Sequence, residues 1–159
     1  FNFREFFRVW TGDAEKDYRP VPEGKRIGDF VHEDDVRSFL NLITTESKDT
    51  KYPFATDEFR KEFKHTFWMV PGVKEAKALS AVLKTHPVFM HYQVVNVAGE
   101  GDEELPYDNA LKLVQDAIKT NDYTITISCG KLTTGVTVRE WTAVMMLTGS
   151  ATTDAKGYM

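Results

Sequence analysis

The spacing of hydrophobic positions along the chain predicts helices first. In residues 32–45 the apolar positions follow the i, i+3, i+4, i+7 spacing of one helical face: Val36, Phe39, Leu40 and Ile43. Residues 33–35 are acidic, which suits the positive end of a helix dipole. The pattern therefore predicts an amphipathic helix over residues 32–45, and the charged stretch at residues 56–64 predicts a further helical turn or two.

From Thr66 onward, short β-rich runs alternate with helical patterns. The expected strands are Thr66–Val70, Tyr92–Ala98, Tyr123–Cys129 and Trp141–Leu147, and the expected helices are residues 73–84 and 107–119. The second run is apolar almost throughout, as is typical of strands covered on both faces. This order predicts an α/β fold with an open, mainly parallel sheet, helices on both faces and right-handed crossovers.

Residues 1–31 are less regular. Prolines and glycines interrupt any long element, and we expect Phe3, Phe6 and Phe7 to dock onto a neighbouring surface. We therefore divide the chain into a helical and irregular connecting region, residues 1–60, and a sheet-containing domain, residues 61–159.

Composition and charge narrow the class of protein. Hydrophobic residues make up 42% of the 159 residues and charged residues 28%, as in ordinary globular domains. Cys129 is the single cysteine, which excludes a disulfide within the chain and fits a reducing cytoplasm. The net charge of −4 disfavours tight DNA binding by this chain alone, because phosphate neutralisation needs positive charge. This net charge remains compatible with a domain that contacts one strand of the DNA through a few backbone amides.

Candidate chemistry lies where the expected strands end, because ligands of open α/β sheets gather at the carboxyl ends of strands. The loops concerned are Pro71–Gly72, Gly99–Glu104 and Gly130–Val138. The last of them follows a strand and is rich in small hydroxyl residues and glycine. Such a loop can offer amides and hydroxyls to phosphate oxygens.

The string Leu132–Val138, LTTGVTV, resembles the fifth conserved motif of superfamily 2 helicases, in the variant of restriction-type translocases (type I R subunits and type III Res-like proteins). Phe67–Val73 with Glu75–Leu79 looks like the strand and helix of the fourth motif, and Tyr92–Gly101 fits the next strand and loop. The resemblance covers about residues 65–159. It implies that residues 61–159 are the second RecA-like lobe of an ATP-driven DNA translocase, cut out of a longer protein before the last motif.

The resemblance also implies the site residues. Ser128, Cys129 and Gly130 would lie nearest the DNA, as would Gly99 in the preceding loop. The residues nearest ATP would be Thr134, Gly135 and Thr137. Many relatives carry an aspartate where Thr137 stands, and a hydroxyl cannot replace a carboxylate as a pure acceptor.

The chain lacks the remaining parts of a motor. It has no GxxxxGK[ST] phosphate loop, no acidic metal motif and no arginine-bearing sixth motif. We therefore expect no catalytic residue and no bound cofactor or metal in this fragment. The resemblance implies that ATP and Mg²⁺ bind in the parent protein, between this lobe and an upstream first RecA-like lobe. DNA, and methylase or specificity subunits, would be further partners in a bacterial cytoplasm.

Two other classes of function stay open. Val94–Gly101 is a strand entering a GxG loop, as in class I adenosylmethionine-dependent methyltransferases, although Asn96 stands where an acidic residue is expected. A non-catalytic interaction domain is compatible with the acidic charge.

Several polar clusters have simpler structural interpretations. His32–Asp35 could hold a metal, but an acidic helix start is the favoured interpretation. His65, His86 and His91 show no metal-ligand spacing and are expected on the surface or in packing. Asp57, Glu58 and Lys61 superficially match a nuclease cluster and are expected to form a solvated helix face.

Overall fold

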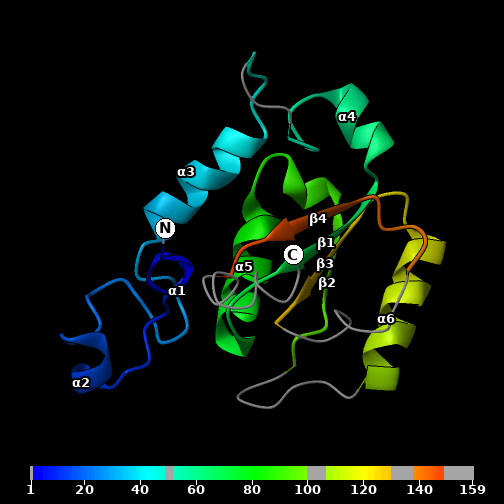
Figure 1. The fold of residues 1–159 in the computed structure, drawn as a ribbon. Coiled ribbons are helices and arrows are strands. Elements are labelled where there is room, and N and C mark those ends of the chain that lie inside the picture. Colours follow the sequence, from blue (N-terminus) through cyan, green and yellow to red (C-terminus); the bar gives the residue numbers. More distant parts are fainter. Residues whose placement is uncertain (1, 49–51, 100–106, 130–137, 149–159) are drawn as a thin grey trace.

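The computed structural model describes residues 2–48, 52–99, 107–129 and 138–148. Their elements are α1 (Phe3–Phe6), α2 (Ala14–Asp17), α3 (Glu33–Ile43), α4 (Asp57–Glu62), β1 (His65–Met69), α5 (Val73–Thr85), the 3₁₀ turn η1 (Phe89–His91), β2 (Gln93–Asn96), α6 (Tyr107–Thr120), β3 (Thr124–Ser128) and β4 (Ala143–Met146) (Figure 1). None of the helices in these ranges is both long and apolar enough to cross a membrane.

The strands form a four-stranded sheet in the order β2-β3-β1-β4, and every pair is parallel. Trp68 of β1 is in register with Ile127 of β3 and with Met145 of β4. Backbone hydrogen bonds continue past the strand ends, from Leu147 N–H to Met69 O at 2.8 Å for example. The predicted α/β fold with a parallel sheet is confirmed.

Helices cover both faces of this sheet, and Figure 1 shows α5 and α6 on opposite sides. Successive side chains of a strand point to opposite faces. Trp68 accordingly packs in one core cluster with α3 and α5, whereas Phe67 and Met69 pack in a second cluster with α6. The path from β1 to β2 crosses the sheet in one direction and the path from β2 to β3 returns. Right-handed crossovers in opposite directions place their helices on opposite faces, as observed.

The first of these clusters extends into residues 1–60. Phe7 and Phe30 are each 1% exposed and share this cluster with Trp68 and Leu79. Phe3 and Phe6 pack against its rim, and Phe6 meets Phe39 edge-on with ring centroids 6.1 Å apart. The surface onto which the N-terminal phenylalanines dock therefore belongs to this chain. The division at residue 60 stays a prediction, but the hydrophobic core is continuous across it.

Candidate functional site at the carboxyl edge of the sheet

The carboxyl ends of the parallel strands all lie along the same side of the sheet. The connections that follow β1 and β3 distinguish one position among these strand ends. After β1 the chain leaves to the face covered by α5. Of the connection from β3 to β4, the described end, with Val138 and Trp141, packs on the opposite face with α6. Neighbouring strands whose connections depart to opposite faces define a topological switch point, where α/β sheets bind ligands. The ends of β1 and β3 therefore mark the candidate site.

Backbone hydrogen bonds hold the ends of β1 and β2 against β3. Val70 N–H donates to Ser128 O at 2.9 Å, and Val97 N–H donates to Ile127 O at 2.9 Å. Ser128 itself is 0% exposed. Ser128 therefore presents no accessible surface to a nucleic acid in this structure.

Three of the residues expected at the DNA lie in the described part of the chain, on adjacent strand ends. Cys129 follows β3 and is half-buried, and its thiol Sγ lies 3.9 Å from Ala98 O beyond β2. Gly99 comes next, with φ at 133°, a backbone conformation that favours glycine. The structure thus brings Cys129 and Gly99 to neighbouring positions. Their contact with DNA stays a prediction.

The other predicted site residues lie outside the described residues. They are Gly130, expected at the DNA, and Thr134, Gly135 and Thr137, expected at ATP.

The start of α5 lies at the same edge and was not singled out as a binding element by sequence reasoning. Gly72 is the N-cap of this helix and provides no side-chain cap. The carboxylate of Glu75 occupies the space beside Gly72 where a capping side chain would lie. A Cβ added to Gly72 would be only 2.6 Å from Glu75 Oε2. A glycine three positions before a glutamate at a helix start was the available signal. Free amides at a helix N-terminus attract anions, and here the protein supplies its own.

Burial raises the pKa of the Glu75 carboxyl above its ordinary value. A hydrogen bond from its own backbone N–H and the charges of Arg4 and Lys74 act in the opposite direction without cancelling the effect of burial. A negative charge in this half-buried position is therefore poorly stabilised. A phosphate that approached the α5 terminus would have to displace or neutralise it.

The simpler interpretations of the remaining polar clusters agree with the structure. Glu33, Asp34 and Asp35 form the acidic first turn of α3. Within the described ranges, no three His, Cys, Asp or Glu side chains gather as a metal site requires. Asp57 is exposed and pairs with Arg60 of the same helix at 3.1 Å. His86 is buried between α3 and η1 and has a packing role.

One comparison with known proteins gives a match. The chain is 30% identical, over 152 residues or 92% of its length, to a protein of Mycoplasma pneumoniae that is described, as a proposed assignment, as the C-terminus of a type II restriction enzyme and methyltransferase. The chain spans 20% of that protein's length. No protein-family model matches the chain. No solved structure matches it either.

Proposed function

We propose that this chain is part of a restriction-modification protein, in which it forms the second RecA-like lobe of an ATP-dependent DNA translocase. In this proposal the chain supplies one wall of an ATP·Mg²⁺ site and a part of the DNA track. An upstream lobe supplies the phosphate loop and the metal ligands. The similarity to a restriction enzyme and methyltransferase supports the restriction-modification context.

The position of β3 carries the proposal. This strand lies inside the sheet, between β2 and β1, and it leads directly into the loop whose sequence resembles the fifth helicase motif. The loop therefore starts at the switch point of the sheet, where an α/β fold binds its ligand. Gly135, Thr134 and Thr137 are the residues proposed for ATP. Cys129, Ser128, Gly130 and Gly99 are those proposed for DNA.

The test uses the full-length parent protein with Gly135→Asp. An added carboxylate at the nucleotide would repel the phosphates and occupy the space that glycine leaves. We expect DNA-stimulated ATP hydrolysis and translocation, measured by triplex displacement, to fall by at least about tenfold. Gln115→Asp is the matched control, because it adds the same charge to an exposed position of α6. Full ATPase activity in a folded Gly135→Asp protein would contradict the proposal.

A methyltransferase is the second candidate, because the name of the Mycoplasma protein includes that activity and Gly99 has a positive φ at the end of β2. In dinucleotide-type sheets the strand before the glycine loop and the strand that follows it in sequence are neighbours. Here Gly99 follows β2, and α6 lies in the chain between β2 and its parallel neighbour β3. Calorimetry with adenosylmethionine decides between them, since saturable binding to this chain would favour the methyltransferase.

A further inference from the structure

A groove with a cavity volume of about 700 Å³ runs along α5, from Lys74 in its first turn to Thr85 at its end. One wall is formed by Trp10, Thr11 and residues 26–30, and the other walls are the start of α3 and the length of α5. The groove joins the N-terminal region to the helix that follows β1.

The rim of this groove is more positive than the chain as a whole. It carries four cationic side chains, namely Arg26, Arg37, Lys74 and Lys77, and two carboxylates, Asp29 and Glu33. Glu33 is already paired with Arg37 at 3.1 Å and with Lys25 at 3.8 Å. Within the described residues, neither Arg26 nor Lys77 forms an ion pair. In a chain of net charge −4, this local surplus of cations is complementary to an acidic ligand.

The floor of the groove is apolar. Trp10 is 2% exposed and Val82 is 6% exposed, and the small side chains of Ala78 and Ala81 leave room above α5. Ile27 stands on the rim with 68% of its surface exposed. An apolar side chain of a ligand would gain by burial here, whereas a sugar–phosphate backbone would not.

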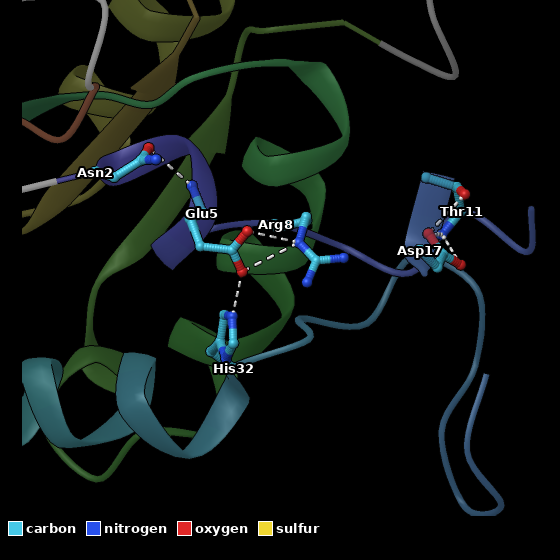
Figure 2. A network of polar contacts seen from close by, with 6 residues as sticks. All are labelled: Asn2, Glu5, Arg8, Thr11, Asp17 and His32. Carbon is cyan, nitrogen blue, oxygen red and sulfur yellow. Dashed lines mark hydrogen bonds and ion pairs between the residues drawn. The ribbon is translucent and has the colours of Figure 1, made fainter. Parts of the chain in front are cut away.

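Internal contacts fix the N-terminal wall. Val9 and Phe30 form an antiparallel bridge, and Gly28 N–H donates to Trp10 O at 2.8 Å. Figure 2 shows Glu5 between Arg8 and His32, which ties α1 to the start of α3. A groove formed before its ligand arrives loses less conformational entropy on binding.

We propose that this groove binds an acidic peptide segment that inserts one apolar side chain over Ala78 and Ala81 and places its carboxylates against Arg26 and Lys77. Nucleic acid fits less well, because its sugar–phosphate backbone would leave the apolar floor at Ala78 and Ala81 unused. The proposal does not depend on the motor function, since it involves neither the switch point nor the loop after β3.

The probe is a fluorescein-labelled peptide with leucine between glutamate pairs, titrated with the full chain and followed by anisotropy. We expect saturable binding that weakens as salt is raised. The double variant Arg26→Glu, Lys77→Glu should bind about tenfold more weakly. Lys84→Glu is the matched control, because Lys84 is exposed on the same helix but does not line the groove. It should leave the affinity within about twofold.

Three comparisons make the result decisive. A peptide with serine in place of leucine should bind more weakly, and equal binding would overturn the role of the apolar floor. An oligothymidylate of equal net charge that binds more tightly than the peptide would overturn the choice of ligand. Absence of peptide binding, or an equal loss in Lys84→Glu, would overturn the site itself.

Discussion

His86 illustrates how one buried side chain joins three elements. Its Nε2 lies 2.9 Å from Asn41 Oδ1 on α3, and its Nδ1 accepts a hydrogen bond from Val88 N–H at 3.1 Å, just before η1. Since Nδ1 accepts, the hydrogen-bond network assigns the ring proton to Nε2 and the ring is neutral. Burial lowers the pKa of this imidazole, and the charges of Arg37 and Arg60 lower it further.

Stability should therefore depend on the protonation of His86. A folded-state pKa below the ordinary 6.5 means that the unfolded chain binds the proton more readily. The contribution of the neutral His86 ring to the free energy of unfolding is complete above about pH 6.5. It is lost as pH falls from there toward the folded-state pKa. His86→Ala should lower the urea midpoint at neutral pH, and its difference from the wild type should shrink at about pH 5.5. The exposed His91 provides the control, and an equal pH effect in His91→Ala would contradict the assignment.

For Glu75 we expect the opposite pH dependence of stability. Because burial raises its pKa, the folded protein holds the proton more tightly than the unfolded chain does. Stability then falls as pH rises from about 4.5 through the raised pKa. We expect Glu75→Gln to be more stable than the wild type at neutral pH, with the gain disappearing below about pH 4.5, measured by thermal unfolding.

The matched control for this prediction is Glu58→Gln. Glu58 also lies in the first turn of a helix, α4, but it is exposed. Its removal should cost up to about 1 kcal/mol through loss of the interaction with the helix dipole. A loss of stability in both variants would contradict the account of Glu75.

If the switch point binds phosphate, Glu75→Gln should also strengthen the binding of DNA by the parent protein.

The turn that contains α2 depends on one buried carboxylate. Asp17 is 2% exposed and accepts hydrogen bonds from Thr11 N–H, from the Thr11 hydroxyl at 2.8 Å and from Gly12 N–H at 3.0 Å (Figure 2). Desolvation raises its pKa, but the hydrogen bonds from Thr11 and Gly12 and the charge of Arg8 outweigh it, so that the pKa lies below the ordinary 3.8.

Asp17→Asn should loosen this turn, because an amide group presents a donor where the backbone needs an acceptor. We expect faster amide hydrogen exchange in residues 10–18. The loss of stability should be present above about pH 3.8 and should vanish as pH falls through the lowered pKa. Asp13→Asn is the control, since Asp13 caps α2 and asparagine caps a helix equally well. Unchanged exchange in Asp17→Asn would contradict the role of Asp17.

Hydrophobic periodicity was sufficient to predict the main elements. The helices expected at residues 73–84 and 107–119 are Val73–Thr85 and Tyr107–Thr120. The strand expected at Tyr92–Ala98 is shorter, Gln93–Asn96, because a turn in which Ala98 N–H donates to Asn96 Oδ1 ends it. Periodicity is a local signal, and it therefore finds an element without saying which strands will be neighbours.

Two features lay beyond that local signal. The insertion of β3 between β2 and β1 depends on pairing between distant segments, and the switch point follows from that insertion. The burial of Trp10 and Phe30 shows no period, because irregular segments bury whichever residues face the core. Glu75 belongs to the same class, since its pKa depends on burial and on the charge of Arg4, which lies in α1, distant in sequence. The ATP contacts of Gly135 and Thr137 lie outside the described residues and stay predictions.

The whole molecule combines the connecting region and the sheet in one core. A single hydrophobic cluster includes Phe7, Phe30, Leu40 and Phe54 from the connecting region, and it continues to Leu147 beyond β4. On the sheet side it includes fully buried residues of β1, β3 and α5, such as Trp68, Ile127 and Leu79. A boundary at residue 60 would cut through this cluster and expose apolar surface on both sides.

A shared core predicts shared unfolding. The chain should unfold in one calorimetric transition, with equal calorimetric and van't Hoff enthalpies. Residues 61–159 alone should lack that transition, because the face of α5 that carries Leu79 would lose its cover from α3 and from Phe54. Hydrogen exchange gives an independent measurement, since the amides of α3 and of β3 should open with the same free energy. Two separate transitions, with the earlier one confined to residues 1–60, would show instead that residues 61–159 are an independently folded domain against which the connecting region packs. In that case the groove along α5 would lose its wall before the sheet unfolds.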